Sequence, residues 1–248
     1  MQNIKNLNST NSSKIIVLIN LFGDDMINEI INKINNIPIK FDLFISTSSL
    51  ERIELIEKKI KKNKNFKKYY IIMIDKRLKN AKRLFKIFNI IAKQYKYICN
   101  INDIVFNKNN ENLRYTFYNN LIGNENTVKD ILSNFEKYQK LGLVFSETNS
   151  DILSERLDDN NEKFINDILT TICPENNYKI GKKYVLIIGN IFWAKISSIY
   201  QIFNQKLYKA FQRTINDEFR LLIKNINIIL LYFVKINGYY YKKIFKYN

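Results

Sequence analysis

The sequence contains no histidine, and it has only six glycines, two prolines and two cysteines in 248 residues. The absence of histidine excludes Ser–His–Asp and Cys–His catalysis and any metal site that needs an imidazole ligand. A general base must therefore be a carboxylate, a lysine or a tyrosine. Cys99 and Cys173 lie far apart and form no CxxC pair, so we expect free thiols and a reducing compartment.

Glycine-rich phosphate loops and long apolar runs are also absent. Neither GxGxxG nor GxxxxGK[ST] occurs, so the sequence has no dinucleotide-binding or P-loop fingerprint. Residues 1–13 are polar and lack the apolar core of a signal peptide. No apolar run reaches the length of about 18 residues that a membrane span requires. We therefore expect a cytoplasmic protein with a disordered tail over residues 1–13.

Positive charge is abundant, with 40 Lys and Arg against 23 Asp and Glu and a net charge of +17. This excess favours nucleotide phosphates, nucleic acid or an anionic membrane surface as partners, and a merely solvated basic surface is the alternative. Lysines and tyrosines gather over residues 226–248, which is typical of a membrane interface; a last helix packed on the domain would explain them equally. Nucleic acid ranks last, because no RNP-type or helix-turn-helix motif supports it.

Residues 14–49 predict a strand, a helix and a second strand. The apolar run 15–19 indicates a strand buried on both faces, and an apolar stripe over residues 26–34 indicates a helix. Residues 41–47 form the second strand, which makes a right-handed, parallel βαβ unit. Because ligands bind outside the carboxyl ends of such strands, we expect Asn20, Ser46, Thr47 and Ser48 at the working edge.

The same alternation continues along the chain. We expect strands at 69–74, 95–101, 141–145 and 184–188, and helices at 50–62, 79–94, 124–140 and 164–172. We expect loops at 106–114 and 146–162. This pattern predicts an α/β domain over residues 14–204, with a mostly parallel sheet flanked by helices, and then a helical, basic and aromatic segment over residues 205–248.

Charged residues follow the predicted third and fourth strands. Asp75 and Arg77 follow the third strand, where an arginine would reach a diphosphate; an ordinary charged loop is the alternative. Asn102 and Asp103 follow the fourth strand, where a carboxylate would hold Mg²⁺ or Mn²⁺ on a diphosphate; a turn aspartate is the alternative.

Two further residues are candidates for catalysis and acceptor binding. Glu147 follows the fifth strand and is the best-placed carboxylate for a base, although a solvated loop glutamate is the alternative. Trp193, close to Gly189, offers an aromatic face to an acceptor sugar. A core tryptophan whose N–H finds a partner is the alternative.

Four segments of the sequence resemble segments of the rhamnan synthesis protein F family, a family of bacterial glycosyltransferase-like proteins. Residues 19–22 (INLF) resemble the family's strand that ends in His-Leu-Phe, and residues 41–48 (FDLFISTS) resemble its second strand. Residues 120–145, from NLIG to GLVF, resemble its LLG…LGLIFP segment. Residues 189–195 (GNIFWAK) resemble its GSMFWAR segment.

The resemblance implies a GT-A-like α/β sheet and an activity in cell-surface polysaccharide assembly. It implies transfer of a sugar, such as rhamnose, from a nucleotide-sugar donor to a glycan acceptor that is usually lipid-linked, at the inner face of the membrane. The residues expected to bind the donor are Asn20, Thr47, Asp75, Arg77 and Asn102. Asp103 is expected to hold the metal ion and to take part in catalysis. Glu147 is expected to act as the base, and Trp193 is expected to bind the acceptor.

Three places depart from the family pattern. Asn20 stands where the family has histidine, residues 75–79 stand where it reads NRGRD, and residues 100–106 stand where it reads KIHTKKS. All three fall at the expected donor site. They keep a second function open, namely a catalytically inactive module with the same fold that binds glycan, membrane or a partner protein.

Overall fold

The computed structural model describes most of the predicted α/β domain and the end of the chain. The described residues are 14–21, 23–24, 26–61, 65–73, 94–103, 111–147, 159–175, 179–180, 185, 187, 191–200 and 228–245. The strands are β1 (Ile15–Leu21), β2 (Phe41–Thr47), β3 (Phe66–Met73), β4 (Tyr97–Asn102), β5 (Leu141–Ser146), β6 (Phe192–Lys195) and β7 (Tyr240–Ile244). The helices are α1 (Met26–Ile34), α2 (Leu50–Ile60), α4 (Glu111–Ile122), α5 (Glu125–Lys137), α6 (Asp159–Ile172), the 3-10 turn η5 (Ile196–Ser198) and residues 228–236.

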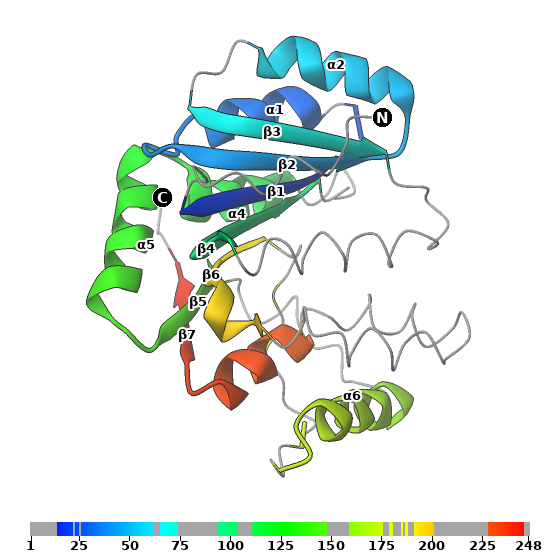
Figure 1. The fold of residues 1–248 in the computed structure, drawn as a ribbon, viewed down its shortest axis with the longest axis vertical. Coiled ribbons are helices and arrows are strands. Elements are labelled where there is room, and N and C mark those ends of the chain that lie inside the picture. The colour runs from blue at the N-terminus through cyan, green and yellow to red at the C-terminus, as the bar shows by residue number, and fades with distance from the viewer. Residues whose placement is uncertain are drawn as a thin grey trace.

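The described strands form one sheet in the order β3-β2-β1-β4-β6-β5-β7 (Figure 1). Strands β3, β2, β1 and β4 are parallel to one another, and β5 and β7 are also a parallel pair. Strand β6 lies between β4 and β5 and is antiparallel to both, so the other six strands share one direction. The predicted mostly parallel α/β sheet is therefore confirmed, and it is compatible with a GT-A-like fold.

Helices cover both faces of the sheet. One core cluster joins the sheet to α1, α2, α4 and α5, and the other joins it to α6 and helix 228–236. Strand β1 contributes to both clusters, because Val17 and Ile19 face the first and Ile16 and Leu18 face the second. Burial on both faces explains why this strand has an uninterrupted apolar sequence.

Local sequence signals set the ends of several helices. The apolar stripe predicted at the start of the chain is the buried face of α1. Helix α2 begins after Ser49, whose side chain accepts a hydrogen bond from the Arg52 backbone N–H. Helix α5 begins after Asn124, whose side chain accepts one from the Thr127 N–H at 2.9 Å.

The structure corrects two predicted loops. Residues 111–114 form the first turn of α4, and α6 already starts at Asp159. The helical signal in α4 is the repeat of Phe117 and Tyr118 with Leu121 and Ile122 four residues later, all of them buried. The asparagine-rich composition before this repeat led to the loop prediction.

The last two strands also differ from the sequence prediction. Strand β6 lies at Phe192–Lys195, after the predicted strand 184–188, most of which lies outside the described residues. The C-terminal segment is helical over 228–236, but it then turns at Gly238, which has φ +74°, and continues as β7. The Gly238 and Tyr239 N–H groups bond back to the helix in the Schellman pattern. Residues 1–13, 79–93 and 205–227 lie outside the described residues.

Gly142 lies at an irregularity in the pairing of β5 with β7, and its lack of a side chain allows Ser198 and Tyr239 to approach β5 closely. A Cβ atom there would lie 2.6 Å from the Ser198 Cβ and 2.7 Å from the Tyr239 Cβ. We therefore expect Gly142→Ala to reduce the free energy of unfolding by about 1–3 kcal/mol, as overpacked cores do. Urea unfolding measures this.

The matched control is Gly238→Asn, where the added side chain has open space and asparagine tolerates a positive φ. We expect this control to lose less than about 1 kcal/mol, because its main cost is the positive φ, which asparagine tolerates better than most residues. Equal stability of both variants would show that η5 and Tyr239 do not lie against Gly142 as described.

Candidate functional site at the carboxyl edge of the sheet

The order in which the chain adds strands to the sheet reverses at β1. The chain adds β2 and β3 on one side of β1 and then β4 on the other, which makes the carboxyl ends of β1 and β4 a topological switch point. Ligands of open α/β sheets bind at such points. The pairing register places Asn20 directly opposite both Ser46 and Asn102.

These three residues form a hydrogen-bonded row across the sheet edge, which we call the rim row. The Ser46 hydroxyl donates to Asn20 Oδ1, and Asn20 Nδ2 donates to Asn102 Oδ1. Residues that are paired in register lie on the same face, which here is the face that packs on α6 and helix 228–236. The structure therefore brings two predicted donor-binding residues, Asn20 and Asn102, into direct contact.

Asp103 ties this row to the loop that follows β1. Its Oδ2 atom accepts a hydrogen bond from the Gly23 N–H, and its own N–H donates to the Asn20 carbonyl at 3.0 Å. The side chain is buried, so this carboxylate fixes the approach of the chain to α1. A negative charge close to the start of a helix is also favourable.

Tyr118, which the sequence did not point to, supports the row from α4. Its hydroxyl donates to the Asn102 carbonyl at 2.8 Å. Burial raises the pKa of Tyr118, and the Glu29 and Asp103 carboxylates raise it further. The phenol therefore stays protonated at neutral pH and remains a donor. The helical repeat of α4 is the signal that could have revealed this residue.

Arg52 is a second residue that sequence reasoning missed. It forms an ion pair with Asp24 through Nε, and its Nη1 donates to the Ser48 hydroxyl at 2.7 Å. It therefore connects the loops that follow β1 and β2. Its position, three residues after the N-cap Ser49 at a strand end, is the signal that could have revealed this guanidinium on the rim.

Three predicted donor-binding residues do not join the rim row. Thr47 is fully buried on the opposite face of β2, and its hydroxyl has no hydrogen-bond partner among the described residues. Asp75 and Arg77 lie outside the described residues.

Glu147 lies at the same edge but farther along the sheet. Its N–H donates to the Ile244 carbonyl at 2.8 Å, and its Oε1 accepts from Lys243 Nζ at 3.2 Å. The registers of β4, β6 and β5 place it level with Asn102. Since β6 lies between, the two are two strand spacings apart, roughly 10 Å. Glu147 and the rim row share an edge, and the role of Glu147 as a base stays a prediction.

Trp193 lies in the core and not on the rim. It is fully buried between Cys99 of β4 and Val144 of β5, and its indole N–H donates to the Leu121 carbonyl at 3.1 Å. This matches the alternative of a core tryptophan whose N–H finds a partner. No face of the ring is open to an acceptor sugar in this structure.

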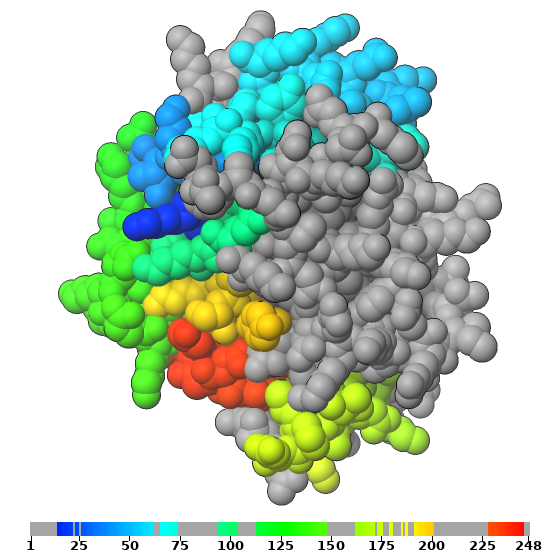
Figure 2. All heavy atoms as spheres, in the orientation of Figure 1, coloured from blue at the N-terminus to red at the C-terminus, as the bar shows by residue number. Residues whose placement is uncertain are grey.

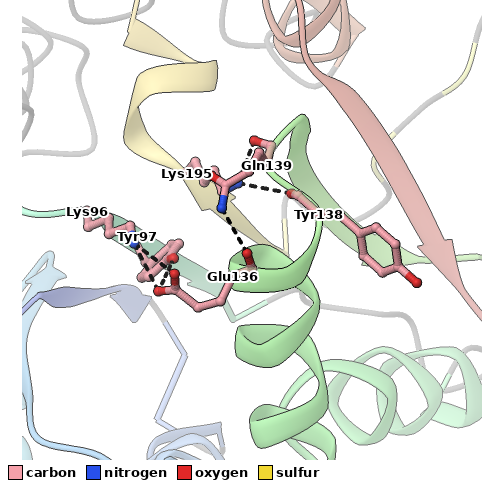
Figure 3. Close-up of polar contacts among 6 residues, drawn as sticks. All are labelled: Lys96, Tyr97, Glu136, Tyr138, Gln139 and Lys195. Atoms are coloured by element: carbon pink, nitrogen blue, oxygen red, sulfur yellow. Dashed lines mark hydrogen bonds and ion pairs between the residues drawn. The ribbon is translucent and has the colours of Figure 1, made fainter.

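A second polar cluster lies at the opposite edge of the sheet (Figure 3). Lys195 is buried, and its Nζ donates to the Tyr138 and Gln139 carbonyls at 3.2 and 2.7 Å, which closes the end of α5. Burial lowers the pKa of Lys195, and the neighbouring Lys96 lowers it further, while Glu136 raises it. Because this cluster lies where β4 begins and β6 ends, it supports the fold and not the rim.

The described residues contain no group of three or more Cys, Asp and Glu side chains that could hold a metal ion by themselves. Mg²⁺ is commonly bound by one or two carboxylates together with substrate phosphates. Asp103, the predicted metal ligand, is a single buried carboxylate that already accepts from the Gly23 N–H, and its metal role stays a prediction. No helix in the described part of the chain combines the length and apolar character of a membrane span.

The fold and the rim together define an α/β protein with a mostly parallel sheet and a polar edge at its switch point. The sequence profile of the rhamnan synthesis protein F family matches residues 1–239. The chain therefore belongs to the rhamnan synthesis protein F family, as its sequence segments indicated. A comparison with individual curated proteins found no match.

The geometry of Lys195 gives a stability prediction. Lys195→Met keeps the apolar stem but removes the donors from the Tyr138 and Gln139 carbonyls at the end of α5. We expect the free energy of unfolding to fall by about 1–3 kcal/mol, because two hydrogen bonds from a charged donor would be lost.

The matched control is Lys129→Met on α5, which removes an exposed pair with Glu125. It should change the free energy of unfolding by no more than about 0.5 kcal/mol. If the two variants lose the same stability in chemical unfolding, Lys195 does not act as a buried helix cap.

Proposed function

We propose that this chain is a glycosyltransferase-like protein of rhamnan and cell-surface polysaccharide synthesis. It transfers a sugar, for example rhamnose, from a nucleotide-sugar donor to a glycan acceptor at the cytoplasmic face of the membrane. The observation that carries this proposal is the rim row. This chain, which belongs to the family, has hydrogen-bonding side chains linked across the switch point where open α/β sheets bind their ligands.

The donor diphosphate would lie against the ends of β1 and β4. Asn20 and Asn102 would exchange their mutual hydrogen bond for bonds to the donor, and the guanidinium groups of Arg52 and Arg77 would offset phosphate charge. Asp103 would hold Mg²⁺ or Mn²⁺ together with the diphosphate. Such an ion would neutralise charge that develops on the leaving diphosphate.

Transfer requires an acceptor hydroxyl to attack the anomeric carbon of the donor sugar. The bond from that carbon to the diphosphate oxygen breaks, and the nucleoside diphosphate leaves with the electron pair. In an inverting mechanism Glu147 would take the hydroxyl proton, after releasing the Lys243 ammonium with which it is paired. Trp193 would support the acceptor side indirectly, by fixing β6 in the core.

The second candidate function is a catalytically inactive module that binds glycan, membrane or a partner protein. A specific observation favours it, since the rim side chains satisfy one another and Asp103 is engaged by the Gly23 N–H. The family histidine is also replaced by Asn20. In this function the fold would remain while the donor site no longer turned over substrate.

Asp103→Asn separates the two functions. The amide keeps an oxygen that can accept from the Gly23 N–H, but it removes the charge that would hold a metal ion. We expect the purified wild type to bind dTDP-rhamnose or another nucleotide sugar with micromolar affinity in the presence of Mn²⁺. Asp103→Asn should weaken this binding at least about tenfold, or by about 1.4 kcal/mol, in calorimetry.

The control is Asp167→Asn at an exposed position of α6, a helix that lies well apart from β1 in Figure 1, and it should leave binding unchanged. Hydrolysis or transfer of the donor with and without Mn²⁺ is measured in parallel. Absence of both binding and turnover with every nucleotide sugar would refute the transferase function and support the inactive module.

A further inference from the structure

Strand β7 forms one edge of the sheet and carries a mixture of lysine and aromatic side chains. Among the described strands it pairs only with β5. Tyr240 is 45% exposed and Phe245 is 38% exposed, and Lys242 and Lys243 between them are also exposed. In Figure 2 the red atoms of this end of the chain reach the molecular surface.

The surface continues onto the turn that joins α5 to β5 and onto helix 228–236. The Tyr240 N–H donates to the Lys140 carbonyl at 2.8 Å, so this turn lies beside the start of β7. We call the whole surface the basic-aromatic edge. Its members are Lys137, Tyr138, Lys140, Tyr232, Lys235, Tyr240, Tyr241, Lys242, Lys243 and Phe245.

The chemistry of this edge argues against another β-strand as its partner. Lysines on an outer strand are a common means by which proteins block strand addition. Here Lys242 and Lys243 are consecutive, so they lie on opposite faces of β7. A strand added beside β7 would therefore have an ammonium group next to it on each face.

The edge is also poorly suited to stacking nucleic-acid bases. Lys137 Nζ lies 5.3 Å from the Tyr138 ring centroid, and Lys235 Nζ lies 5.8 and 5.7 Å from those of Tyr232 and Tyr241. An ammonium group therefore covers one face of each of these three rings, which a stacking base would have to displace. Tyrosine rings beside lysine ammonium groups are instead typical of the headgroup region of a membrane.

We infer that the basic-aromatic edge binds the surface of an anionic bilayer. Its lysines would meet lipid phosphates, and Tyr240 and Phe245 would enter the interface. Because β7 is parallel to β5, its end lies at the same sheet edge as the rim row, and Lys243 contacts Glu147 there. Residues 240–245 of this edge lie beyond residues 1–239, the stretch that matches the family.

Vesicle cosedimentation of the full chain tests the inference. We expect binding to phosphatidylcholine vesicles that contain phosphatidylglycerol and no binding to phosphatidylcholine alone. The double variant Lys140→Gln/Lys242→Gln should weaken binding about 30-fold, because each lysine near an anionic surface contributes about 1 kcal/mol.

A charge-matched control separates this edge from the overall charge of +17. Lys58→Gln/Lys59→Gln removes two exposed lysines from α2, which packs over the other end of the sheet (Figure 1). It should retain nearly full vesicle binding. Equal loss in the two double variants would overturn the inference, because binding would then follow net charge alone.

Aromatic variants test insertion separately from charge. Tyr240→Ser/Phe245→Ser should lose the part of vesicle binding that persists at high salt, whereas Tyr115→Ser, at an exposed tyrosine of α4, should keep it. Binding of single-stranded oligonucleotide by a chain that ignores anionic vesicles would also overturn the inference. The assay contains no nucleotide sugar, so its failure would leave the proposed transfer untouched.

Discussion

The pairing of β1 with β2 on one side and β4 on the other is the constraint on which the candidate site depends. Two parallel neighbours in fixed register hold Asn20 opposite Ser46 and Asn102. A slip of one residue in β1 would turn the Asn20 side chain to the other face and bury a polar amide against α1. The burial of β1 on both faces therefore fixes the site as well as the core.

The parts of the fold that the sequence predicts are those with local signals. A short apolar run bounded by polar residues defined β1, and an apolar stripe at helical spacing defined α1. These two elements and β2 form one βαβ unit whose handedness is nearly invariant. From that unit alone, Asn20 could be placed at the carboxyl edge, and the structure places it there.

The parts that the sequence does not predict depend on contacts between distant segments. All four residues of β6 are buried, so the strand has no alternation to reveal it, and its reversed direction follows from pairing with β4 and β5. For the same reason Trp193 could not be assigned to the core or the rim. The two-fold periodicity places Thr47 on the face opposite Asn20, but its strand-end position alone did not show this.

The arrangement of charge along the sheet connects the edge that carries the rim row with the outer strand β7. Lys195 stabilises the end of α5 at the edge where the parallel strands begin. The opposite edge carries the rim row, whose side chains hydrogen-bond to one another. At that edge the Lys243–Glu147 pair joins the tip of β5 to β7. A carboxylate that must release an ammonium before it accepts a proton would respond to whatever anion the outer strand meets. On the two proposals made above, in which Glu147 is the base and β7 meets an anionic bilayer, contact of Lys243 with lipid phosphate would free Glu147 at the membrane surface.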